Sequence, residues 1–158
     1  MLFEWLQALH HWEVAAYLRR SLYLYPFVNA AHILGIALLV GAIVPVDLRI
    51  LGLTGPPLGA AARALARFAA AGLALAVATG FLLFSVQPLE YAANPAFWTK
   101  VSLVALGALN AFGLRASRAW RMAEIDGEIG AGLKLGAGIS LLLWIAAVFA
   151  GRAIAFLQ

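Results

Sequence analysis

Long apolar segments separated by short polar ones dominate the pattern along this chain. An α-helix of about 20 apolar residues crosses the hydrocarbon layer of a bilayer. Four segments reach that length or approach it, and we predict membrane spans at residues 22–46, 68–86, 97–114 and 135–156. Only helices or closed barrels satisfy their backbone hydrogen bonds in lipid. The predicted fold class is therefore all-α: a four-helix transmembrane bundle in a single membrane domain, residues 1–158.

The N-terminal segment, residues 2–20, has a different pattern, in which apolar residues alternate with charged ones at helical spacing. This pattern predicts an amphipathic helix that lies in the membrane interface. Glu4 stands where a secretory signal would carry basic residues, so we expect the segment to be retained. The polar stretch between the third and fourth spans, residues 115–134, is predicted to be a solvated loop or a short surface helix.

The composition agrees with a membrane protein. Hydrophobic residues make up 65% of the chain and charged residues 11%, whereas soluble domains are roughly a quarter charged. The net charge of +4 comes from basic residues at the ends of apolar segments, with no basic run interleaved with aromatics, so the predicted partner is the lipid bilayer and no nucleic acid. With no cysteine and two methionines, disulfides and thiolate metal sites are excluded.

Small residues recur at four-residue spacing inside the predicted spans. Such pairs let helix backbones approach closely in lipid, and they predict a tight bundle with a face that could also bind a second copy or a partner subunit. The pairs and triplets are Ala31/Gly35, Ala37/Gly41, Gly72/Ala76/Gly80, Gly107/Ala111, Gly136/Ser140 and Ala147/Gly151.

Candidate chemistry is confined to a few polar side chains within the spans, because no nucleophile–histidine–acid set, phosphate-binding glycine loop or HExxH motif is present. We assign no catalytic residue. Polar groups in hydrocarbon are costly and mark functional sites by default. They are Asn29, His32, Thr79, Lys100, Asn110 and Arg152.

His32 is the most informative of them. It lies six residues after Pro26, roughly 9 Å into the first span, and Asn29 shares its helix face. Lys100 and Arg152 lie near the ends of their spans in the same leaflet. We expect either a b-type haem with His32 as the metal ligand and Lys100 or Arg152 on its propionates, or an anion or quinone headgroup among the same residues.

Simpler interpretations stand beside these. His32 would then hydrogen-bond a neighbouring helix, Lys100 and Arg152 would extend to the interface as anchors, and the protein would be a cofactor-free structural or accessory membrane subunit. His10 and His11 would be solvated on the surface helix, unless one of them supplies a second axial ligand. Asp47 would form an ion pair with Arg49 at a helix terminus.

Four segments carry a family resemblance. They are Tyr25-Pro26-Phe27-Val28-Asn29-Ala30-Ala31-His32-Ile33-Leu34-Gly35 with Asp47-Leu48-Arg49-Ile50-Leu51-Gly52, then Thr79-Gly80-Phe81-Leu82-Leu83-Phe84, and finally Ala150-Gly151-Arg152-Ala153-Ile154-Ala155-Phe156. In these the chain resembles a family of small four-helix proteins of the bacterial cytoplasmic membrane, a domain of unknown function. The histidine followed by glycine three residues later is more distantly similar to copper-resistance-D-type proteins and to haem-binding membrane protoporphyrinogen oxidases. That likeness implies a ligand role for His32.

The distribution of basic residues gives the first testable prediction. Lys and Arg on alternate sides number seven (Arg49, Arg63, Arg67, Arg115, Arg118, Arg121, Lys134) against four (Arg19, Arg20, Lys100, Arg152). The side richer in basic residues is cytoplasmic, so both termini should be periplasmic. A reporter active only in the periplasm should work when fused to either terminus; activity confined to a cytoplasmic reporter would reverse the orientation.

Overall fold

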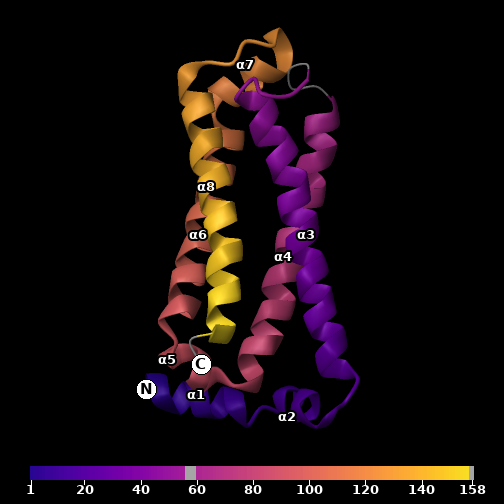
Figure 1. Cartoon of the computed structure of the whole chain (residues 1–158), viewed down its shortest axis with the longest axis vertical. Helices are drawn as coiled ribbons and strands as arrows, with labels where there is room; N and C mark the ends of the chain where they lie inside the picture. The colour runs from indigo at the N-terminus through magenta and orange to yellow at the C-terminus, as the bar shows by residue number, and fades with distance from the viewer. Residues whose placement is uncertain (56–59, 157–158) are drawn as a thin grey trace.

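Four long helices form the body of the molecule (Figure 1). The computed structural model describes residues 1–55 and 60–156. The long helices are α3 (Leu24–Ile50), α4 (Ala60–Val86), α6 (Pro95–Ala116) and α8 (Ala131–Ala153), and each is long and apolar enough to cross a membrane. The predicted all-α four-helix membrane fold is confirmed, and the protein is a multi-pass integral membrane protein.

The helices extend beyond the predicted spans. α3 has 27 residues and continues through Asp47 and Arg49 to Ile50, and α4 begins at Ala60, so that it includes the exposed Arg63 and Arg67. A helix of this length is about 40 Å long, more than the roughly 30 Å of hydrocarbon. The charged residues end the apolar stretch and leave the helix intact. The sequence Thr54-Gly55-Pro56-Pro57 between α3 and α4 is typical of a turn, and its two prolines lie outside the described residues.

Short helices close the two ends of the bundle. α1 (Leu2–His10) and α2 (Glu13–Arg20) lie across one end, near α5 (Pro88–Ala93) and the 3-10 turn η1 (Ile154–Phe156). α7 (Arg118–Asp126) lies at the opposite end (Figure 1). We call these the α1 end and the α7 end.

The N-terminal segment is amphipathic, as predicted, but the prediction of a single continuous helix was wrong. The backbone leaves helical geometry at Trp12 (φ −58°, ψ 133°), where the indole ring lies 6.4 Å from the ring of Phe81 on α4. Leu6, Ala15 and Leu18 are buried. The break therefore lets α1 and α2 each bury a separate apolar face against the end of the bundle, and the spacing of apolar residues alone does not reveal it.

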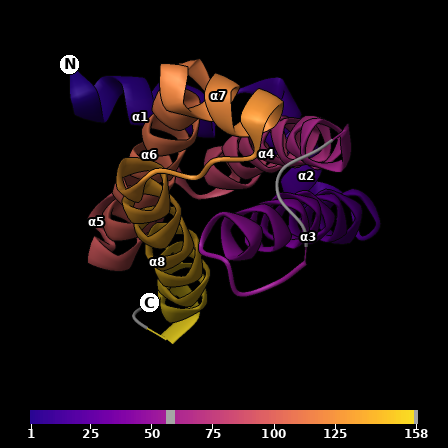
Figure 2. The ribbon, with the colours of Figure 1, turned by 90° about the horizontal axis from the view of Figure 1, so that it is seen from above.

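The bundle consists of two helical hairpins. α3 packs along α4, α6 packs along α8, and the hairpins join where α3 contacts α8; the view from above shows the same pairing (Figure 2). Between α3 and α4 the backbones nearly touch. A Cβ added at Gly35 would lie 2.7 Å from Ala76 N, and one added at Gly72 would lie 2.6 Å from Leu39 N.

Glycines also shape the α6–α8 hairpin. Trp144 packs against Gly107, where an added Cβ would lie 3.0 Å from the indole ring, and the side chain of Leu114 fills the space above Gly136. The Asn110 amide donates to Gly136 O at 3.0 Å. A polar side chain thus joins two helices where their backbones are close, as is common in membrane bundles.

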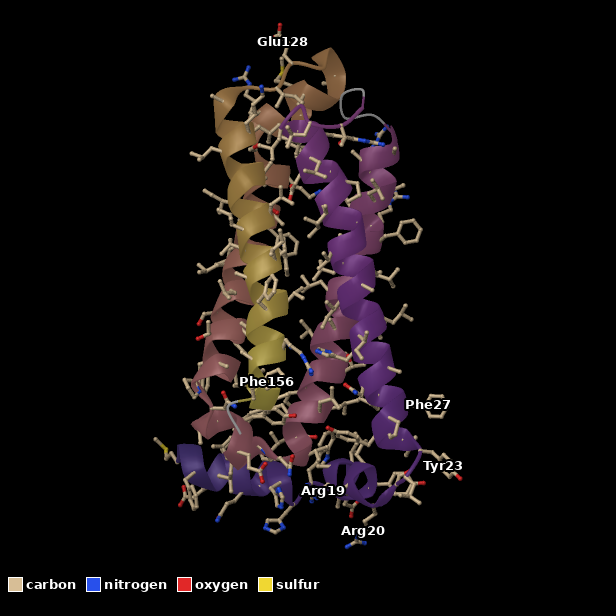
Figure 3. The ribbon with its side chains drawn as sticks, viewed as in Figure 1. Arg19, Arg20, Tyr23, Phe27, Glu128 and Phe156 are labelled. Atoms are coloured by element: carbon tan, nitrogen blue, oxygen red, sulfur yellow. The ribbon has the colours of Figure 1, made fainter. Side chains whose placement is uncertain are left out.

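Large apolar side chains cover the outside of the bundle. Leu109, Leu142 and Phe149 are each about 70% exposed (69%, 71% and 72%), and Figure 3 shows Phe27 pointing outward from α3. A soluble monomer rarely exposes so much contiguous apolar surface. This surface faces lipid, and the helices must associate through the close contacts at their glycines.

Gly35 and Gly41 offer a matched test of this packing. Gly35→Leu should lower the free energy of unfolding by at least about 1–3 kcal/mol, because the side chain would push α3 away from α4. Sequence spacing grouped Gly41 with Gly35, yet nothing lies within 4 Å of a Cβ added at Gly41. Gly41→Leu should therefore change stability by less than about 0.5 kcal/mol. Unfolding in detergent, followed by tryptophan fluorescence, measures both; equal losses would contradict the assigned helix interface.

Candidate functional site

His32 on α3 forms a hydrogen bond with Thr79 on α4. The imidazole Nδ1 lies 3.1 Å from Thr79 Oγ1, and the Thr79 hydroxyl donates its own proton to Leu75 O at 2.6 Å. Since that proton is committed to Leu75, Thr79 Oγ1 can only accept from His32. We therefore assign the proton of the neutral imidazole to Nδ1, which leaves a lone pair on Nε2.

Lys100 on α6 faces that lone pair. Its Nζ lies 3.5 Å from His32 Nε2, and both side chains are half-buried. An ammonium group has only donors, so Lys100 donates and the imidazole accepts. A second proton on His32 would place two donors and two positive charges against each other. With Lys100 as an ammonium group, the pair therefore holds one positive charge.

Two glycines leave the space that these side chains occupy. A Cβ added at Gly80 on α4 would lie 3.0 Å from His32 Cε1, and one added at Gly151 on α8 would lie 3.3 Å from Lys100 Nζ. All four long helices thus contribute to one cluster, which we call the His32 site: His32, Thr79, Gly80, Lys100 and Gly151.

The His32 site lies inside the membrane-spanning part of the bundle, toward the α1 end. His32 is eight residues from the start of α3 and Thr79 is seven residues from the end of α4. At 1.5 Å per residue, both lie about 10–12 Å from those helix ends. Lys100 is five residues from the start of α6, so its side chain extends inward from about 8 Å.

The other two predicted binding residues lie apart from this cluster. The Arg152 side chain is exposed, and its guanidinium carbon lies 4.9 Å from the centre of the Phe156 ring, at the α1 end where Figure 3 labels Phe156. Asn29 is one turn from His32 on α3, but its side chain is exposed. Of the predicted set, the structure brings Lys100 to His32, and it brings neither Asn29 nor Arg152 into hydrogen-bond contact with the imidazole.

His10 and His11 also lie away from His32. Arg19 connects α1 to α4: its guanidinium lies 3.4 Å from His10 Nδ1 and donates to His10 O at 2.6 Å and to Val86 O at 2.9 Å. Figure 3 shows Arg19 beside α2 at the α1 end. The two histidine rings are 5.4 Å apart. They belong to the corner where α1 meets α2.

Sequence reasoning missed the two glycines and underrated Thr79. The signal for Thr79 was available, because Thr79 and Gly80 interrupt an apolar span beside one another. The role of Gly151 depends on the rotation of α8 about its axis, which the small-residue pattern does not fix.

Asp47 corrects another expectation. It does not pair with Arg49: its side chain is only 4% exposed, and Oδ2 has no hydrogen-bond partner. Residues two apart on a helix point in different directions, and here Asp47 faces the interior of the bundle while Arg49 is only half-buried.

The donor set at His32 is narrow. Within the described residues, no group of three or more His, Cys, Asp or Glu side chains could hold a metal ion. The unprotonated nitrogen of His32, Nε2, already accepts a hydrogen bond from the Lys100 ammonium group. An iron ion that binds Nε2 would have to displace that ammonium group, whereas a ligand that accepts hydrogen bonds could bind beside it.

The chain matches no family model, and comparison with curated proteins and with solved structures gives no match either. The geometry of the site must therefore carry the functional argument.

The assigned tautomer can be tested directly. In protein labelled with ¹⁵N-histidine, the His32 signal should be that of a neutral ring with its proton on Nδ1. Thr79→Val removes the acceptor and should mix the two tautomers, while Thr99→Val, at an exposed position on α6, should leave the signal unchanged. A proton on Nε2 in the wild-type protein would contradict the assignment.

Proposed function

We propose that this integral membrane protein binds the headgroup of a membrane-soluble quinone between His32 and Lys100. The observation that carries the proposal is the small number of hydrogen-bond and ion-pair partners around Lys100. Within the described part of the chain, His32 Nε2 is its one hydrogen-bond partner, and no carboxylate lies within ion-pairing distance. An ammonium group has three N–H donors, so this intramembrane cation has donors left for a ligand.

The chemistry of a quinone suits those donors. Its carbonyl oxygens accept hydrogen bonds, and its apolar body dissolves in the bilayer that surrounds the helices. Lys100 would donate to one carbonyl, and His32, held by Thr79, would orient Lys100 through Nε2. When bound, the quinone would supply two-electron redox chemistry, and the protein would supply binding, orientation and positive charge.

A b-type haem is the second candidate, and one observation favours it. The hydrogen bond from Nδ1 to Thr79 leaves Nε2 unprotonated, which is the state that binds iron, and a partner on the other ring nitrogen orients such ligands. Against it, Lys100 stands in front of Nε2. The ammonium would have to move, toward a propionate for example, and a second axial ligand would have to come from elsewhere.

A cofactor-free accessory subunit belongs to a different class. In that case the contacts among His32, Thr79 and Lys100 would only hold α3, α4 and α6 together. This alternative predicts that substitutions of His32 alter the stability of the protein but do not change the binding of any ligand.

Binding of a short-chain ubiquinone to the purified protein in detergent tests the proposal. A hydrogen bond to a charged group contributes about 1.5–3 kcal/mol. Lys100→Met, which keeps a long unbranched side chain, should therefore raise the Kd for the quinone about 10- to 100-fold. The matched control is Arg152→Leu, which removes an exposed cation from the same end of the bundle and should leave the Kd unchanged.

The same preparations separate the alternatives. A Soret absorbance that His32→Ala abolishes, in protein expressed with ample haem, would replace the quinone with haem. If the wild-type protein neither binds the quinone nor absorbs in that region, the accessory-subunit alternative is correct. Equal quinone affinity of the wild type and Lys100→Met would place any quinone away from the His32 site.

A further inference from the structure

A second polar location lies near the α7 end and has no part in the His32 site. A cavity of about 90 Å³ opens among α3, α4, α6 and α8, with Trp120 of α7 at its edge. Most of its walls are alanine and leucine side chains. Its polar lining comes from Asp47 on α3, Ser140 and Trp144 on α8, and Arg115 on α6. We call it the Asp47 pocket.

Two buried polar atoms on the lining residues lack partners. Asp47 is 4% exposed and Trp144 is 2% exposed, and within the described residues neither Asp47 Oδ2 nor Trp144 Nε1 has a hydrogen-bond partner. Leaving a buried polar group unpaired is costly, and more so for a charged one. Both residues line the same cavity, so an occupant of that cavity is the nearest candidate partner for the two atoms.

The chemistry of these atoms selects the occupant. The Trp144 indole offers a donor, and the Asp47 carboxylate offers acceptors. Water can accept from one and donate to the other, and Ser140 can do either. A bare cation suits Asp47 but not the indole N–H or the Arg115 guanidinium. The volume holds about three waters at roughly 30 Å³ each, and it is well below the roughly 300–1,000 Å³ of a typical ligand pocket.

The pocket reaches the surface beside the α7 end. Arg115, which lines it, is exposed and is the next-to-last residue of α6. Asp47 lies three residues, about 4.5 Å along the axis, from the end of α3. The Arg115 guanidinium stacks 5.7 Å from the Trp120 ring, so it sits at the rim without pairing with Asp47.

We propose that the Asp47 pocket is a hydrated proton-binding site, in which Asp47 exchanges a proton with the aqueous phase at the α7 end. The groups that face it are Arg115 from α6, the Ser140 hydroxyl and the Trp144 indole from α8, and Trp120 from α7. The residues of α4 that line the pocket are apolar. Arg115 is thus the charged neighbour whose field acts on the carboxylate.

This inference is independent of the quinone proposal. Asp47 and His32 are fifteen residues apart on α3, about 22 Å along the helix. The buried Leu39 lies between them. Loss of ligand binding at His32 would leave the Asp47 pocket intact, and the reverse also holds.

Infrared spectroscopy of the protein in lipid nanodiscs tests the proposal. The difference spectrum between the wild type and Asp47→Asn isolates Asp47 from the other six acidic side chains. In that difference a carboxylic-acid C=O band should appear at low pH, disappear as the pH rises and shift in D₂O. Glu128→Gln is the matched control, because Glu128 is an exposed acid at the same end of the molecule (Figure 3), and its own difference spectrum should contain the band of a solvated carboxyl while the Asp47 band stays unchanged.

Further arms address the other occupants. A band that persists at all pH values and does not shift in D₂O would mean a dry, permanently protonated Asp47, and its absence at all pH values would mean a permanently ionised one; either overturns the proposal. A titration midpoint that differs between sodium chloride and choline chloride would make the pocket a cation site. If Asp47→Asn does not fold, Ala111→Leu, which fills the pocket from α6, should suppress the D₂O shift; an undiminished shift would count against hydration.

Discussion

The close approach of α3 and α4 at Gly35 and Gly72 determines where the polar groups of this bundle can meet. Gly35 lies one turn beyond His32 on α3, and the α4 backbone that it contacts at Ala76 lies one turn before Thr79 and Gly80. Contact between backbones fixes the register of the two helices within a fraction of a turn. That register places the imidazole over Gly80 and its Nδ1 against the Thr79 hydroxyl. In lipid, where apolar side chains gain little by leaving their surroundings for one another, such packing is the main source of specificity.

Polar groups are consequently gathered near the two ends of the bundle, with an apolar layer between them. The buried side chains of that layer include Leu39, Ala42 and Ala69 together with the Trp144 ring. Toward the α1 end a cation faces a neutral imidazole, and toward the α7 end a carboxyl oxygen faces a small cavity. Each arrangement leaves hydrogen-bonding capacity unused, which is the expected condition of a site that takes a ligand.

Some features of the fold and of the His32 site can be predicted from the sequence, and others depend on how each helix is rotated about its axis. The spans follow from the length of the apolar runs, and the juxtaposition of His32 with Lys100 follows from counting residues from the helix ends. Contacts such as Gly151 with Lys100 also require the rotation of each helix, which a single sequence does not provide. For the same reason the sequence did not reveal that the side chains of Asn29 and Arg152 are exposed. Asp47 and Arg49 do not pair, because residues two apart on a helix point in different directions.

The signs of the two unpaired groups allow a last step. A carboxylate and an ammonium within one bundle could have paired and lowered each other's cost of burial. Here Lys100 and Asp47 lie near opposite ends of the bundle. Lys100 forms its hydrogen bond with His32, and Asp47 lies about 22 Å from His32 along the axis of α3. No modest side-chain rearrangement can join them. Each must therefore be compensated locally, Lys100 by an acceptor and Asp47 by water or a proton, so the chemistry at one face of the membrane does not depend on direct contact with the other.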